Sequence, residues 1–173
     1  MAGLGVGRAA SVSIAIAVFS ACSRAPEAPL IQEEEPFAGL SFLRAADPKA
    51  EPQFLHGWHP VEQGSWRWTK RRFSVALQPP RIGRPAQLEL AFYIPESSRT
   101  ALGSITLTPA AGGAALPGKT YTTAGEHVYS QEVGGDVLNR DVVVVRFQLD
   151  KVLSPGTADD RELGIVVSSV GLR

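Results

Sequence analysis

The sequence predicts an all-β protein, an antiparallel β-sandwich, and three observations lead to this prediction. Apolar and polar residues alternate in several short segments, as they do in a strand that turns one face to a core. Gly and Pro clusters separate these segments and are typical of turns. Outside the N-terminus, no stretch of ten or more residues carries a helical apolar stripe free of Gly or Pro. Few helices are therefore expected.

The N-terminal segment, residues 1–21, predicts an export signal. Arg8 precedes the uncharged run Ala9 to Ala21, which ends in small residues. This run is shorter than the roughly 20 residues that a helix needs to cross a bilayer. We therefore interpret it as a cleaved signal and not as a permanent membrane span.

The chain has one cysteine, and Phe19-Ser20-Ala21-Cys22 resembles the lipobox of bacterial lipoproteins. The resemblance implies cleavage before Cys22, a diacylglycerol on its sulfur and anchorage in a membrane. Because Ser23, and not aspartate, follows the cysteine, it also implies a cell-envelope location at the outer membrane, facing the periplasm. In a Gram-positive source, the same anchor would lie in the outer leaflet of the plasma membrane. The alternative is a free or buried cysteine behind an ordinary signal.

Residues 22–52 predict a tether, because they contain five prolines and the acidic run Glu33-Glu34-Glu35. Proline-rich chain is extended, at about 3.1 Å per residue. The part from Phe37 to Leu43 is apolar enough to be a strand that docks on the domain, and the sequence leaves both interpretations open.

The sandwich domain is predicted over residues 53–173, with β structure from Trp66 onward. Its strongest alternation places Leu88, Leu90, Phe92 and Ile94 on one face. Further strands are predicted at Phe73-Val75-Leu77, Ile105-Leu107, Val128-Tyr129, Val143-Val145-Phe147-Leu149, and either Ile165-Val167 or Val166-Val170-Leu172.

The composition limits the possible functions. The chain has 17 basic and 17 acidic residues, so no basic excess suggests nucleic acid as a partner. Once Cys22 is lipidated, no thiol remains for a disulfide, and the domain must be held together by packing. The sequence contains no Gly-x-Ser-x-Gly, phosphate-loop, dinucleotide or His-Glu-x-x-His motif. We therefore expect no enzyme and no cofactor.

Two motifs carry a second resemblance. Gly57-Trp58-His59-Pro60-Val61-Glu62, followed by Ser65-Trp66-Arg67-Trp68-Thr69, and the later Asp159-Asp160-Arg161-Glu162-Leu163-Gly164-Ile165 resemble the jelly-roll modules attached to bacterial glycosyltransferases and surface-polysaccharide proteins. These modules are related in form to galactose-binding-like domains. The resemblance implies a jelly-roll fold and a setting among envelope glycans, without a reaction.

The tryptophans of the first motif allow two interpretations. Trp66 and Trp68 share one strand face, and Arg67 points to the other. They either fill the core or form a platform for the apolar face of a sugar ring, with Arg67 or Glu62 bonding to hydroxyls. Trp58 is the preferred platform because Gly57 and Pro60 suggest an accessible loop.

The charged residues also allow several interpretations. Arg161 is expected to pair with Glu62 and so to join the two motifs, because a guanidinium binds carboxylates strongly. Alternatively, the charges line a polar cleft or are simply solvated. A metal site is not expected, since a turn need not bring His56, His59 and Glu62 together. The candidate ligand-binding residues are Trp58, His59, Glu62, Arg67, Asp160 and Arg161.

The sequence as a whole suggests a lipid-anchored envelope protein with a non-catalytic domain. We expect this domain to bind envelope polysaccharide, or to act as a scaffold for glycan-synthesis or export proteins. The alternative is a structural or protein-interaction lipoprotein without a glycan ligand, in which the tryptophans and charges are buried and only maintain the fold.

Overall fold

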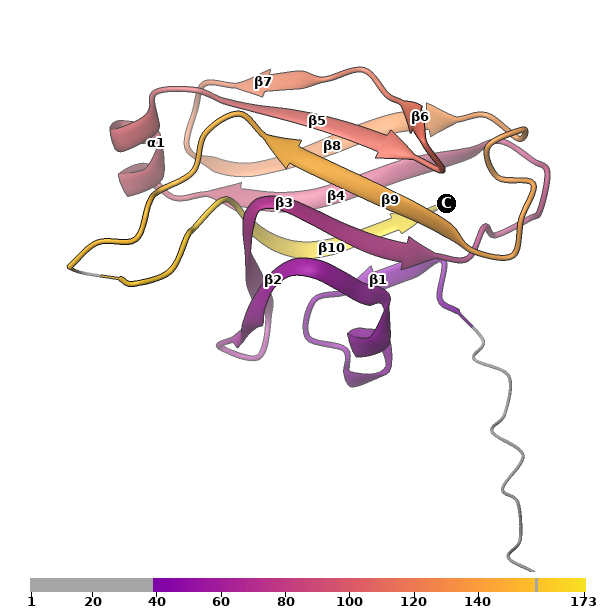
Figure 1. Ribbon diagram of the computed structural model, residues 1–173, viewed down its shortest axis with the longest axis horizontal. Coiled ribbons are helices and arrows are strands. Elements are labelled where there is room, and N and C mark those ends of the chain that lie inside the picture. The colour runs from indigo at the N-terminus through magenta and orange to yellow at the C-terminus, as the bar shows by residue number, and fades with distance from the viewer. Residues whose placement is uncertain (1–38, 158) are drawn as a thin grey trace, which may run out of the picture. The chain divides into compact units, whose positions relative to one another are not determined.

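The computed structural model describes residues 39–157 and 159–173 (Figure 1). The predicted signal, the predicted lipidation site Cys22 and residues 23–38 lie outside these residues. The described chain forms ten strands, a 3-10 helix and an α-helix. Their bounds are β1 Phe42–Arg44, η1 Pro48–Gln53, β2 Phe54–Glu62, β3 Trp66–Leu77, β4 Ala86–Ile94, α1 Glu96–Leu102, β5 Ile105–Ala111, β6 Ala114–Ala115, β7 Lys119–Tyr121, β8 Gly125–Val133, β9 Val143–Leu149 and β10 Val166–Leu172.

Hydrogen bonds join the strands into one curled antiparallel sheet with the order β6-β5-β9-β3-β10-β4-β8. β3 connects the two layers, because its first part pairs with β10 and its last part with β9. In Figure 1, β5 and β9 lie in one layer, and β4, β8 and β10 lie in the other. The predicted all-β antiparallel sandwich is confirmed.

The core lies between the two layers and is built from alternate residues of the strands. The predicted face of β4 is confirmed, since Leu88, Leu90, Phe92 and Ile94 are all buried. Phe92 also meets Tyr121 of β7 edge to face at 4.9 Å between ring centroids, which connects the layers. Burying a large apolar side chain contributes roughly 1.5 to 3 kcal/mol. Packing of this kind therefore supplies the main stabilisation.

In the described chain, β structure begins before residue 53. β1 pairs with β10, and its Leu43 is fully buried. Of the two interpretations of residues 37–43, the docking strand agrees with the structure in part, because the strand covers Phe42–Arg44.

Two elements differ from the sequence prediction. The segment interpreted as a loop around Trp58 is the strand β2, which pairs with β3 through three register shifts. These irregularities interrupt the alternation that would reveal a strand. The helix α1 was not predicted because its seven residues are fewer than the shortest stretch that we considered.

The last strand follows the first predicted pattern up to Val167 and the second from Val170 onward, since Ile165, Val167, Val170 and Leu172 belong to the core, whereas Val166 does not. A β-bulge lies between Val167 and Ser169, which accounts for the ambiguous alternation. Among the described residues, neither helix has the length and apolar character required to cross a membrane.

Candidate functional site

The outer face of the β3-β10-β4-β8 layer carries a row of side chains that includes two aromatic rings. Trp68 of β3 is the register partner of Val166 in β10. Val166 faces Tyr93 of β4, and Tyr93 faces Glu126 of β8. Directly paired residues project to the same face of a sheet. Since Phe92 beside Tyr93 is buried in the core, this row lies on the opposite, outward face.

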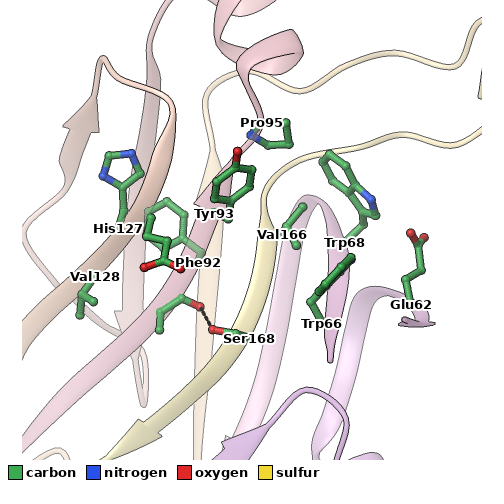
Figure 2. A pocket seen from close by; sticks show the side chains of 12 residues that line it. Glu62, Trp66, Trp68, Phe92, Tyr93, Pro95, His127, Val128, Val166 and Ser168 are labelled. Atoms are coloured by element: carbon green, nitrogen blue, oxygen red, sulfur yellow. Dashed lines mark hydrogen bonds between the residues drawn. The ribbon is translucent and has the colours of Figure 1, made fainter. Parts of the chain in front are cut away.

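A pocket of about 600 Å³ lies over this row. Figure 2 shows the two tryptophans of β3 on one side of it and the β4 and β8 side chains on the other. The lining residues are Glu62, Trp66, Trp68, Ala91, Phe92, Tyr93, Pro95, Glu126, His127, Val128, Val166 and Ser168.

The pocket exposes apolar surface that the fold does not cover. Tyr93 near the end of β4 is 43% exposed, and Val128 on the edge strand β8 is 53% exposed. Trp66 and Trp68 are half-buried, and no aromatic ring of the described residues stacks on either of them. Part of each indole is therefore available to a ligand.

The local sequence explains this arrangement. Alternation along β3 directs Trp66 and Trp68 to the outer face and Arg67 to the inner side, as predicted. Ser168 is the extra residue of the β-bulge in β10. It lies between the register row that contains Val166 and the row that contains Ala91. The hydroxyl of Ser168 donates to the Ala91 carbonyl at 3.3 Å, a bond drawn in Figure 2.

Below the pocket, His127 completes an aromatic cluster on the inner side of the layer. Its ring lies 5.6 Å from Phe92 and 4.9 Å from Tyr121, between centroids. Its Nε2 lies 3.0 Å from the Thr123 carbonyl oxygen. Burial raises the pKa of Tyr121 to about 12, and the nearby Tyr129 adds to the shift. This cluster supports the lining from below.

The two carboxylates of the pocket differ in their surroundings. Glu126 is exposed at the β8 end. Glu62, at the β2 end, accepts a hydrogen bond of 2.6 Å from Nη1 of Arg161. The predicted Arg161–Glu62 pair that joins the two sequence motifs is thus confirmed.

Arg161 has a second acidic partner, Asp159. Its Nη2 donates to Oδ2 of Asp159 at 2.9 Å, and its backbone N–H donates to Oδ1 of the same side chain. The hydrogen bonds from Arg161 lower the pKa of Asp159 to about 2. The same bonds raise the pKa of Arg161 above its ordinary value. Arg161 therefore stays charged and holds the loop before β10 against the end of β2.

Trp58 lies in a strand and is packed, so the expectation of an accessible loop is wrong. Its ring meets Phe54 at 4.8 Å and Phe73 at 5.1 Å between centroids, both edge to face. Its indole N–H donates to the Ser74 carbonyl at 2.8 Å. These contacts hold β2 on β3, and they give Trp58 a structural role in this fold.

His59 and Arg67 are buried away from the pocket. Arg67 is 6% exposed, donates to the Ala45 carbonyl at 2.8 Å and forms an ion pair with Glu51. His59 Nε2 lies 2.8 Å from the Glu162 carbonyl oxygen. Both side chains therefore have partners within the protein.

The structure does not assemble the alternative cleft of Glu62, Arg67, Asp160 and Arg161. Arg67 points to the opposite side of β3 from the pocket, and Asp160 is exposed beside the Arg161 pair. Within residues 39–157 and 159–173, no three His, Cys, Asp or Glu side chains are grouped as metal ligands. Of the six candidate residues, Glu62 is the one that lines the pocket.

Sequence reasoning missed the residues that β4 and β8 contribute to the pocket. Tyr93 and Val128 are large apolar side chains at outward positions of alternating strands. That signal was present in the sequence. However, the placement of both beside Trp68 depends on the register of four strands, which a single sequence does not specify.

No family model and no curated protein matches this chain. Solved structures are similar to it at low identity. A family 35 carbohydrate binding module from Clostridium thermocellum has a TM-score of 0.45 and 9% identity, over 76% of this chain and 96% of that one. A 4-O-methyl-alpha-glucuronidase with specificity for decorated arabinogalactans has a TM-score of 0.49 and 10% identity, over 87% of this chain.

An exo-beta-1,3-galactanase from Phanerochaete chrysosporium has a TM-score of 0.47 and 11% identity, over 79% of this chain. The aligned region spans 29% of the galactanase and 19% of the glucuronidase. Both enzymes are thus much longer than the part that resembles this chain.

Proposed function

We propose that this protein is a non-catalytic glycan-binding protein that holds sugar rings in the pocket on the outer face of the β3-β10-β4-β8 layer. The observation that carries the proposal is the pair Trp66 and Trp68, which lie side by side in an open pocket with indole surface uncovered. Sugar rings have one apolar face and a rim of hydroxyls. A half-exposed indole provides the matching apolar surface.

The polar groups of the pocket suit the rim of such a ring. Glu62 on β2 and Glu126 on β8 both line the pocket, from strands at its two sides, and can accept hydrogen bonds from hydroxyls. Glu62 is also fixed in place by Arg161. A mostly apolar pocket with a few well-placed polar groups is the usual form of a small-molecule site.

The proposed location is the cell envelope, with the domain anchored by lipid on Cys22. Two or more acyl chains are needed for stable anchoring, since one chain binds only marginally. Replacing Cys22 by Ser in the full chain should move the protein from the membrane fraction to the soluble fraction. Unchanged membrane association of Cys22→Ser would contradict the lipoprotein assignment.

Binding is tested with the full chain on a glycan array and on immobilised envelope polysaccharide. Trp68→Ala should abolish retention, because it removes half of the indole surface, and it should shift the melting temperature only slightly. Ile82→Ala is a matched control, since Ile82 is 52% exposed and does not line the pocket. Wild-type protein that retains no glycan, or retention that survives Trp68→Ala, would contradict the proposal.

The second candidate is a structural or protein-interaction lipoprotein. The observation in its favour is that Trp58, His59 and Arg67 all have partners within the domain. If wild-type protein binds no glycan and Trp68→Ala lowers stability as much as Trp58→Ala does, this second candidate is the better one.

A further inference from the structure

The charged side chains that line the pocket are both acidic. Its charged lining residues are Glu62 and Glu126, and among the described residues no lysine or arginine lines it. Glu62 is neutralised by Arg161 at 2.6 Å. Glu126 is exposed, and the structure records no ion pair for it. The pocket therefore carries a net negative charge at its β8 end.

The aromatic side chains, like the carboxylates, favour a positively charged ligand. The face of an indole or phenol ring is electron-rich and attracts ammonium groups, and tryptophan is the strongest of the aromatic residues in this respect. Glu126 is the register partner of Tyr93, so a carboxylate and a ring stand together on neighbouring strands. An ammonium group between them would meet both attractions. A carboxylate at the same point would be repelled.

Two basic residues of this face lie in a neighbouring depression. Arg44 and Arg173 line a second pocket, together with Asp47, and that pocket meets the first at Ser168. Arg173 is already paired with Glu89 at 3.4 Å and stacked over Phe42. These two arginines do not line the aromatic pocket, and neither does Lys70, which is exposed two residues after Trp68 on β3.

We infer that the aromatic pocket selects amine-bearing, cationic sugars over neutral and acidic ones. The inference rests on the proposed glycan-binding function and assigns the ligand class of the same site. One sugar ring lies on Trp66 and Trp68, and the ammonium group of another ring of the same oligosaccharide is directed toward Glu126 and Tyr93, because β8 and β4 lie three and two strands away from β3. Because Glu126 is exposed, the preference decreases as added salt screens the charge.

The test compares three β-1,4-linked oligosaccharides of equal length, made of glucosamine, glucose or glucuronic acid. Each ring of the glucosamine oligomer carries an ammonium group where the glucose oligomer carries a hydroxyl, so these two ligands differ mainly in charge. Titration calorimetry of the full chain, at a pH where the amines are protonated, should show glucosamine binding about fivefold tighter than glucose, as expected for one exposed ion pair. The glucuronic acid oligomer should bind most weakly.

Two variants test whether Glu126 is the source of the preference for glucosamine over glucose. Glu126→Gln removes the free charge and keeps the shape, so it should reduce the ratio of glucosamine to glucose affinity to about twofold or less. Glu132→Gln is the matched control, because Glu132 lies on the same face of β8, is exposed, and is about 20 Å further along the strand. It should leave the ratio as in the wild type.

The outcomes separate the two proposals. Binding that Trp68→Ala abolishes, but that shows equal or greater affinity for glucose or glucuronic acid oligomers, overturns the charge selectivity and leaves glycan binding supported. A ratio that Glu126→Gln does not change also overturns it. Absence of binding for all three oligosaccharides, together with an empty glycan array, overturns the proposed function itself.

Discussion

Trp58 on β2 and Trp68 on β3 lie close together in the sequence but in opposite environments. Trp58 has an aromatic ring on each of two sides and a partner for its indole N–H. Trp68 is partly exposed, as Trp58 is, but it lines a pocket on the outer surface and no aromatic ring of the described residues packs against it. The arginines differ in the same way, since Arg67 is buried and Arg161 is one-third exposed.

This difference shows that residue type and loop-like neighbours do not indicate whether a tryptophan ring is available to a ligand. The better criterion is whether the protein itself already uses the ring and its N–H. Trp58 and Arg67 join β2, η1 and β3, and His59 contacts the loop before β10. The aromatic residues of the pocket, by contrast, keep part of their surface exposed. Variants of the two regions should therefore act on different quantities, stability in the first region and binding in the second.

The largest effect is expected at Gly57, where β2 approaches β3. A Cβ there would overlap the Arg72 carbonyl oxygen, and Gly57 has φ +76°. Gly57→Ala should lower the free energy of unfolding by about 4 kcal/mol or more, an exceptional value for one substitution. Urea denaturation measures it.

Gly64 provides the control for that prediction. It has φ +63° and no neighbouring atom within 4 Å of an added Cβ. Gly64→Ala should cost only the backbone strain, about 1 kcal/mol. Equal losses of unfolding free energy in Gly57→Ala and Gly64→Ala would show that β2 can move away from β3 without an energetic cost.

The next largest effect is expected for Trp58→Ala. It removes both edge-to-face contacts and leaves the Ser74 carbonyl without its donor, so we expect a loss of about 3 kcal/mol. Trp68→Ala should cost clearly less. Thermal unfolding of the two variants, measured together, tests the comparison, and a greater loss for Trp68→Ala would reverse the assignment of the two tryptophans.

A smaller effect is expected for Arg161→Met. The side chains of Arg161 and Glu62 are each 33% exposed, so solvent screens the pair, and a loss of about 1 kcal/mol is expected. Arg99→Met is the control, because Arg99 pairs with Glu96 in the exposed helix α1 and should contribute about 0.5 kcal/mol or less. Denaturant midpoints of both variants measure the difference, and similar values would argue against a stapling role of Arg161.

The smallest effect concerns the pH dependence of the Asp159 contact. Hydrogen bonds from Arg161 lower the pKa of Asp159 from 3.8 to about 2 in the folded protein. The unfolded chain therefore binds the proton first, and the contribution of Asp159 is present above pH 3.8 and is lost as the pH falls toward 2. The stability gap between wild type and Asp159→Asn should close over this interval. A gap that stays constant down to pH 2 would show that the carboxylate contact is not formed.

The sequence by itself determined the sandwich and much of its core. Strict alternation in β4 and β9 directs one set of side chains inward, because successive residues of a strand point to opposite faces. The same rule placed Trp66 and Trp68 together and Arg67 opposite to them. The pairing of Arg161 with Glu62 followed from the chemistry of a guanidinium near carboxylates.

Tertiary structure alone decided which of these residues are free to bind. β2 escapes sequence prediction because its pairing with β3 is irregular, and β1 is a strand because β10 and the buried Leu43 hold it in place. The aromatic pocket needs residues from β3, β10, β4 and β8 in register. Register is set by contacts between segments far apart in the chain, so the local pattern identified the two tryptophans but not Tyr93 and Glu126 beside them.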